Sequence, residues 1–178
     1  LKTASKGRIG KSTAIELKNA AKHSIASSMP AKSLELRHTI SLIDELNSEI
    51  AEIETEIQKL MDERNSSILT IPGIGYDMGS MILAEIGDLS KFDSPDKVLA
   101  YAGLSPTTYQ SGYFDSSHSK MEKRGSKYLR YALFNATKYV CIWDPTFKAY
   151  LSKKRAEGKH YYVALSHAAK KLVRLIYA

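Results

Sequence analysis

The chain has 178 residues, of which 43% are hydrophobic and 25% charged, a balance ordinary for a globular protein with a real core. It lacks a run of about 18 apolar residues and a signal peptide, so we expect no membrane partner. The single cysteine, Cys141, excludes an internal disulfide and a cysteine-rich zinc site, and it fits a reducing cytoplasm. Because no methionine begins the chain, we expect a piece of a longer protein.

The formal net charge of +7 is unevenly distributed along the sequence. Residues 101–178 carry 14 Lys and Arg against 4 Asp and Glu, whereas residues 1–65 carry 10 of each. A local excess of positive charge favours a polyanionic partner, most plausibly nucleic acid. The alternative is a basic surface that is only solvated.

Residues 1–65 predict a helical linker and a coiled coil. Apolar residues recur at helical spacing over residues 11–28 until Pro30. A heptad pattern then runs from residue 36 to residue 60, with Leu36, Ile43, Ile50 and Ile57 at position a, and Thr39, Leu46, Ile53 and Leu60 at position d. Ile at a with Leu at d favours a parallel coiled coil between two chains. A hairpin with residues 11–28 of the same chain is the alternative.

A compact helical domain is predicted for residues 66–178, which makes the fold class mostly α. Its first element, about residues 68–88, contains Pro72, Gly73 and Gly75 before an apolar helix. This order indicates a helix-hairpin-helix, in which Gly73 and Gly75 let backbone amides approach a DNA phosphate. A plain corner that needs glycine for its backbone angles is the alternative.

The remaining elements are predicted from their end signals. Ser94 and Pro95 begin a helix, and residues 103–126 form a loop with a short hairpin around residues 110–112. The C-terminal helices fill residues 127–178: the first covers about 127–142, the second starts after Asp144 and ends near Gly158, and the third covers 161–177.

Basic residues cluster where the loop meets the first of these helices. Ser126 is placed to cap that helix, whose N-terminal amides then favour an anion. Lys and Arg at this end oppose the helix dipole, so they indicate phosphate binding rather than helix stabilisation. The predicted phosphate contacts are Lys120, Lys123, Arg124, Lys127 and Arg130. Tyr128 and Tyr131 either touch nucleic acid or belong to the core.

Ser111 lies before Gly112 in the loop, with the basic segment following it. It is either a turn residue or a hydroxyl presented to a phosphodiester. No adjacent histidine or carboxylate pair offers a general base, so its activation must come from elsewhere. The five histidines are scattered without ligand spacing, and we expect no metal site in this chain.

Three stretches in order, "ILTIPGIGYDMGSMILAEIG", "KRGSKYLRYALFNATKYV" and "DPTFKAYLSKKRAEGKHYY", resemble the C-terminal transposase domain of the insertion-sequence "one-ten" family. The resemblance covers about residues 66–178, and residues 1–65 are similar to that family's helical linker and coiled coil. The family comprises DEDD-type, bridge-RNA-guided recombinases of bacteria and archaea.

The resemblance implies a function in cutting and rejoining DNA. It places the catalytic serine at Ser111, and it assigns magnesium to an acidic RuvC-like domain that is missing from this chain. It also implies a guide RNA, assembly as a homodimer or tetramer through the coiled coil, and a cytoplasmic, nucleoid-associated location. A non-catalytic helix-hairpin-helix module that binds DNA and oligomerises is the alternative.

Overall fold

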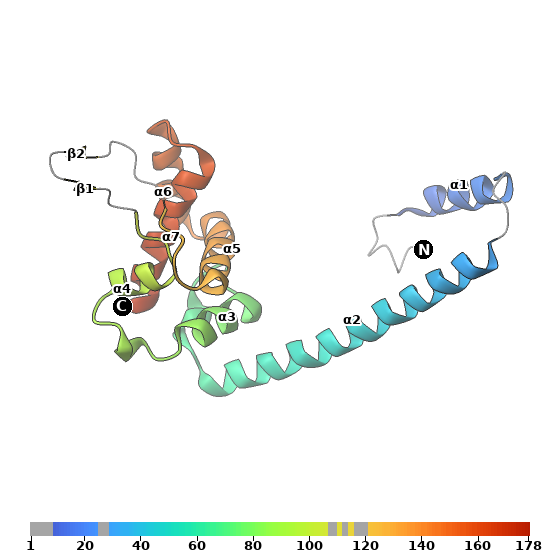
Figure 1. The fold of residues 1–178 in the computed structure, drawn as a ribbon, viewed down its shortest axis with the longest axis horizontal. Coiled ribbons are helices and arrows are strands. Elements are labelled where there is room, and N and C mark those ends of the chain that lie inside the picture. Colours follow the sequence, from blue (N-terminus) through green and yellow to red (C-terminus); the bar gives the residue numbers. More distant parts are fainter. Residues whose placement is uncertain (1–8, 25–28, 107–109, 112–113, 116–120) are drawn as a thin grey trace. The chain divides into compact units, whose positions relative to one another are not determined.

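A computed structural model describes residues 9–24, 29–106, 110–111, 114–115 and 121–178 (Figure 1). The chain divides into two compact units, Leu1–Glu49 and Ile50–Ala178. The division falls inside one long helix, because the last turns of that helix belong to the core of the second unit. Each unit is therefore described by itself.

The first unit consists of α1 (Lys11–Lys22) and the first half of α2 (Pro30–Arg64). The 35 residues of α2 form one uninterrupted helix, which confirms the predicted long helix, and Pro30 stands at its first position. No residue of α1 is buried, so the structure gives the alternative of an intramolecular hairpin no support.

The heptad seam of α2 is exposed in the single chain. The exposed fraction is 60% at Leu36, 51% at Ile50 and 60% at Ile53. Only the end of the helix is covered, where Ile57 is partly buried and Met61 is buried in the core of the second unit. A run of large apolar side chains left in water is what a helix with an absent partner presents.

The second unit is mostly α-helical, as predicted. Its elements are η1 (Ser67–Thr70), α3 (Tyr76–Ile86), η2 (Leu89–Lys91), α4 (Pro95–Tyr101), β1 (Gln110–Ser111), β2 (Phe114–Asp115), α5 (Lys127–Trp143), α6 (Pro145–Ala156) and α7 (Tyr161–Tyr177). The two short strands pair antiparallel, Gln110 opposite Asp115 and Ser111 opposite Phe114, which confirms the predicted hairpin.

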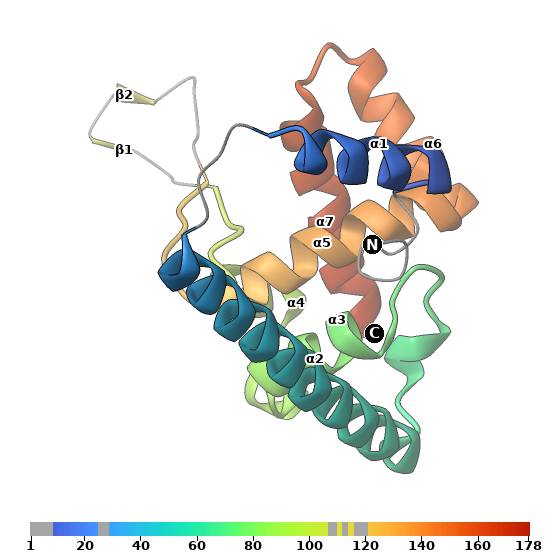
Figure 2. The same cartoon turned by 90° about the vertical axis from the view of Figure 1, so that its right-hand side faces the viewer.

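Helix α5 is the centre of the second unit and packs against α3, α6 and α7 (Figure 2). Its contact face is fully buried at Leu129, Ala132, Leu133, Ala136 and Val140. Small residues on α5 and α7 let the two helices approach closely, and larger ones fill the space between their turns. The α7 side of this contact consists of Ala164, Leu165, Ala168, Ala169 and Leu172.

Local capping explains where the C-terminal helices begin. The Ser126 hydroxyl accepts the Leu129 N–H at 3.0 Å, and Asp144 accepts the Phe147 N–H at 3.0 Å. Pro145 occupies the first turn of α6, where its missing N–H costs nothing. These bonds confirm the predicted starts at residues 127 and 145. Ser94 stands at the N-cap of α4 as predicted, but its side chain makes no capping bond.

The segment predicted as a helix-hairpin-helix is a short 3-10 turn, η1, followed by a loop and α3. Gly73, with a φ of 95°, lies against α5, and a Cβ there would lie 2.6 Å from the Tyr139 carbonyl carbon. Its need for glycine therefore comes from packing inside the chain. Gly75 caps α3, and a Cβ there would meet nothing within 4 Å. The helix-hairpin-helix and its DNA contacts stay predictions.

We expect Gly73→Ala to lower the free energy of unfolding by about 2 kcal/mol or more, because the new Cβ meets the α5 backbone and the positive φ becomes strained. Gly75→Ala, two residues away, should cost less than about 1 kcal/mol. Denaturant unfolding followed by circular dichroism measures both. Equal losses would contradict the close approach of Gly73 to α5.

Candidate nucleic-acid interface

The loop that contains Ser111 leaves and re-enters the core through a narrow neck. Three backbone hydrogen bonds close it: Glu122 N–H to Ser105 O at 3.0 Å, Lys123 N–H to Gly103 O at 3.1 Å, and Ser126 N–H to Tyr101 O at 2.8 Å. A bridge between Pro106 and Met121 lies at its outer end. The neck thus fixes the base from which the β1–β2 hairpin extends.

The two sides of the neck approach so closely that two positions, Gly103 and Gly125, have no room for a Cβ. Gly125 has a φ of 109°, and a Cβ there would run into the Tyr101 carbonyl oxygen. Lys123, two residues earlier, also has a positive φ of 58° although it is not glycine. A positive φ at a residue other than glycine is disfavoured locally, so contacts with the surrounding structure must hold this conformation.

Arg130 of α5 provides that hold. Its Nη1 donates to the Ala102 carbonyl at 3.1 Å and to the Lys123 carbonyl at 3.1 Å, one from each side of the neck. The half-buried guanidinium therefore ties both sides to α5. Arg130 was predicted as a phosphate contact, and the structure gives it this internal role in addition.

A second tie joins the start of α5 to α3. The Ser126 hydroxyl, which caps α5, donates to Glu85 Oε2 at 2.5 Å. A carboxylate thus already lies at the α5 N-terminus, where the helix dipole favours negative charge. For a phosphate that approaches this basic segment, the side chains beside the neck are therefore better placed as contacts than the first amides of α5.

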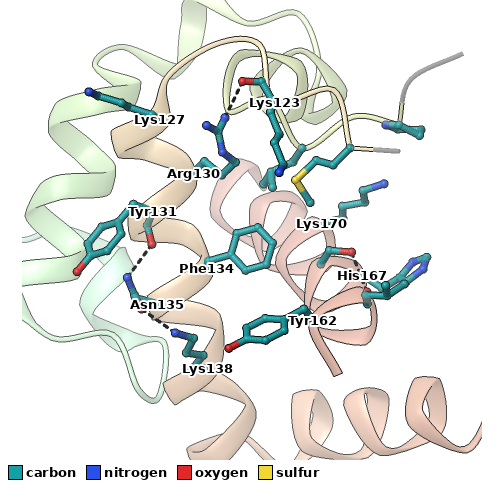
Figure 3. Close-up of a pocket in the computed structure, with 15 residues that line it drawn as sticks. Lys123, Lys127, Arg130, Tyr131, Phe134, Asn135, Lys138, Tyr162, His167 and Lys170 are labelled. Atoms are coloured by element: carbon teal, nitrogen blue, oxygen red, sulfur yellow. Dashed lines mark hydrogen bonds between the residues drawn. The ribbon is translucent and has the colours of Figure 1, made fainter. Parts of the chain in front are cut away.

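Those side chains line a pocket of about 1110 Å³ between the neck, α5 and the N-terminal half of α7 (Figure 3). Five of the lining residues are Lys or Arg, one is a histidine, and none of those that the structure describes is acidic. These basic residues are Lys123, Lys127, Arg130, Lys138, His167 and Lys170. A concave surface with charge of one sign concentrates a polyanion.

The pocket also has apolar and hydrogen-bonding walls. Phe134 lies in its middle in Figure 3, with Tyr131 on one side and Tyr162 below. Asn135 is held in place because its amide donates to the Tyr131 carbonyl at 3.1 Å and accepts from Lys138 Nζ at 3.1 Å. The Ser166 hydroxyl donates to the Val163 carbonyl at 2.7 Å.

Burial and neighbouring positive charges lower the pKa values of two pocket residues on α7. Partial burial, followed by the charge of Lys170, lowers the pKa of His167 below its ordinary value, so the imidazole is neutral at pH 7. Burial and then the neighbouring Arg174 lower the pKa of Lys170. Glu157 acts against the shift of His167 and Asp96 against that of Lys170, but neither acid outweighs burial and the neighbouring positive charges.

The structure brings three predicted phosphate contacts together, Lys123, Lys127 and Arg130, and separates a fourth from them. The Arg124 side chain is 89% exposed and lies 3.8 Å from Glu122, outside the pocket lining. Lys120 lies outside the described residues. For Ser111 the structure describes the backbone in β1 and not the side chain.

Sequence reasoning missed Lys138 and Lys170. Lys138 follows Lys127, Tyr131 and Phe134 at helical spacing on α5, a signal that could have found it. Lys170 joins the pocket only through the packing of α7 on α5. Tyr131 and Tyr128, for which both a core and a surface position were considered, are 59% and 57% exposed and so belong to the surface.

Within the described part of the chain, no three His, Cys, Asp or Glu side chains lie close enough to hold a metal ion. The described residues therefore do not fit a magnesium site. Among the same residues, no helix has both the length and the apolar character needed to cross a membrane.

Comparison with known proteins places the chain among transposases. Residues 65–152 match the family described as "Transposase IS116/IS110/IS902 family". The chain is 32% identical over 130 residues, 71% of its length and 31% of the relative's, to the insertion element IS110 uncharacterized 43.6 kDa protein of Streptomyces coelicolor. It is 32% identical to the pilin gene-inverting protein of Moraxella bovis, over 80% of the chain and 44% of that protein.

A third relative is the transposase for insertion sequence element IS1328 of Yersinia enterocolitica, 37% identical over 48% of the chain and 26% of that protein. In all three comparisons the chain spans less than half the length of the relative. The matched residues 65–152 include the neck, α5 and the Ser111 hairpin.

We expect Arg130→Met to lower the free energy of unfolding by about 2 kcal/mol, because the carbonyls of Ala102, which is buried, and of Lys123 lose a charged donor. Arg130→Lys should recover only part of the loss, since an ammonium does not reproduce the planar guanidinium between two carbonyls. The matched control, Arg124→Met, should stay within about 0.5 kcal/mol of the parent. Thermal and denaturant unfolding give the three values, and a full recovery by lysine would show that charge alone matters at this position.

Proposed function

This chain belongs to the IS116/IS110/IS902 transposase family, and we propose that it is the part of a transposase that holds DNA and presents a serine nucleophile to it. The observation that supports this most directly is the position of the neck. Pro106 and Met121, which pair where the Ser111 loop begins and ends, are both lining residues of the acid-free basic pocket. The loop therefore starts from the surface best suited to hold a phosphodiester.

The proposed reaction is a transesterification at phosphorus. Ser111 Oγ attacks, an O–P bond to serine forms, and the ester bond to one sugar oxygen breaks. The serine proton passes to a general base, and the departing sugar oxygen takes up a proton. Attack by a sugar hydroxyl on the phosphoserine reverses the exchange, so strands are rejoined without loss of the ester bond.

The cations of the pocket serve this reaction through charge. Negative charge grows on the phosphate oxygens during attack, and nearby Lys and Arg stabilise it. Lys123 and Lys127 are exposed side chains that line the pocket, so both are able to reach a phosphate. Arg130 adds its charge while it holds the neck.

The general base and the metal are assigned to another part of the transposase. The residues beside Ser111 in the sequence, Gln110 and Gly112, are not bases at neutral pH. Resemblance to the family supplies an acidic RuvC-like domain with bound magnesium, and the described residues of this chain do not fit such a site.

Rejoining, as well as cutting, is supported by the names of two relatives. Both the Moraxella bovis and the Moraxella lacunata relatives are called pilin gene-inverting proteins. Inverting a gene requires strands to be broken and joined again, which a covalent protein–DNA intermediate accomplishes. A guide RNA as a further partner rests on the family resemblance alone.

The full-length transposase with Ser111→Ala should bind DNA and unfold like the parent, yet form neither a covalent DNA adduct nor recombined product. Ser126→Ala is the matched control, because it removes the α5 cap and leaves Glu85 without a donor. We expect it to lose about 1 to 2 kcal/mol of stability while keeping measurable activity.

Adduct trapping, a recombination assay and thermal unfolding separate the two serines. If Ser111→Ala still recombines DNA, Ser111 is an ordinary turn residue. The chain would then be better described as a non-catalytic DNA-binding module.

We also propose that α2 forms a coiled coil with α2 of a second copy, because its seam is half exposed or more at Leu36, Ile50 and Ile53. Charges introduced by Ile50→Glu and Ile53→Lys should convert the assembly to monomers, and Glu52→Lys, at the outward position c of the heptad, should leave it intact. Sedimentation at several concentrations measures the mass. An unchanged mass of the double variant would place the subunit contact elsewhere.

A further inference from the structure

We propose that the pocket between α5 and α7 binds single-stranded nucleic acid, with one unstacked base placed against Phe134 and Tyr162. The inference rests on the proposal that this chain handles nucleic acid, and it does not depend on the role of Ser111. It concerns the form of the strand at this site.

The shape of the pocket argues against a site for intact duplex. A duplex presents phosphates on its outside and hides the faces of its bases, so a flat basic surface is enough to hold it. This site is instead a partly open hollow of about 1110 Å³, slightly larger than the clefts that commonly hold small ligands. A splayed nucleotide enters such a hollow, whereas a stacked base pair does not.

The aromatic side chains provide faces on which a base can stack. Phe134 is half-buried at the middle of the pocket, and Tyr162 is 60% exposed at its edge (Figure 3). The Tyr162 ring packs on His160 at 5.9 Å and on Tyr161 at 5.4 Å between centroids, which limits its orientations. Exposed aromatic rings beside cations are the combination used to bind single strands.

Polar groups are available for the edge of the base. Asn135 is fixed by two hydrogen bonds that leave its second amide N–H able to donate. Ser166 donates its hydroxyl proton to Val163, so its oxygen can still accept. The neutral His167 carries one donor and one acceptor. Three polar side chains beside a stacking face match the edge of a nucleobase.

The cations of the pocket can contact the phosphates on either side of that base. Lys123 and Lys127 lie toward the neck, and Lys138 and Lys170 lie on the helices that enclose Phe134 (Figure 3). They stand around the aromatic centre rather than in one row. A strand that crosses the pocket would therefore keep a cation near the phosphate before and after the inserted base.

The test uses the 178-residue chain and oligonucleotides that contain 2-aminopurine, a base whose fluorescence rises when it unstacks and falls on an aromatic ring. We expect single strands, and duplexes with one bulged 2-aminopurine, to bind at least tenfold more tightly than a fully paired duplex of the same length. A change in fluorescence should accompany saturation. Equal affinity for paired and unpaired DNA would overturn the proposal.

Substitutions of the aromatic side chains test whether the base binds in this pocket. Tyr162→Ala should weaken single-strand binding about tenfold, within the range measured for loss of one base–aromatic contact. Tyr139→Ala is the control, because Tyr139 is a 52% exposed tyrosine on α5 outside the pocket lining. Phe134→Leu should act like Tyr162→Ala. Since Tyr162 is exposed, its variant stays informative even where Phe134→Leu does not fold. Equal effects of Tyr162→Ala and Tyr139→Ala on binding would show that the base does not bind in this pocket.

Two further arms separate this inference from its alternatives. Competition by free adenosine monophosphate at the same concentration as the oligonucleotide would indicate a mononucleotide site and overturn the strand proposal. Ser111→Ala should bind the probe like the parent. In the full-length transposase, a Ser111 adduct without any 2-aminopurine response would refute the pocket and leave the proposed function standing. A 2-aminopurine response without an adduct would refute the serine alone.

Discussion

The guanidinium of Arg130 joins the Ser111 loop to the rest of the domain, and the geometry of the site depends on it. Its two bonds reach carbonyls that lie 28 and 7 residues away in sequence, on opposite sides of the neck. Because α5 is buried along its other face, a side chain fixed on α5 transmits the position of the core to the loop. Gly125 permits the close approach, and Arg130 holds it.

Helix α5 carries core and site on opposite faces, which explains why its sequence is informative. Leu129, Leu133, Ala136 and Val140 are removed from water, whereas Lys127, Arg130, Phe134 and Lys138 face the pocket at the same helical period. The buried face sets the orientation of the helix. The pocket residues of α5 are then aligned by the helix itself and need no further supporting element.

Much of this fold could be predicted from the sequence because its signals are local. Helix starts at residues 127 and 145 depend on Ser126, Asp144 and Pro145, each within three residues of its partner. The pocket could be predicted only in part. Lys170 reaches it through the α5–α7 contact, and the roles of Gly73 and Arg130 come from backbone groups far away in sequence. Such partners leave no mark on local spacing. The sequence therefore predicted a phosphate contact for Arg130, and for Gly73 either a DNA contact or a corner that needs glycine for its backbone angles.

The pocket carries an excess of positive charge. Folding brings five Lys and Arg side chains and His167 to one hollow without an acid among its described lining residues, and burial, followed by neighbouring positive charges, lowers the pKa values of His167 and Lys170. A structure optimised only for stability would place carboxylates there, as Glu157 is placed between Lys154 and Lys159 on the α6 side. The repulsion is relieved when phosphates enter. The nucleic acid that we propose as the partner would offset this excess of positive charge, and the neck of the Ser111 loop lies at the edge of the same surface.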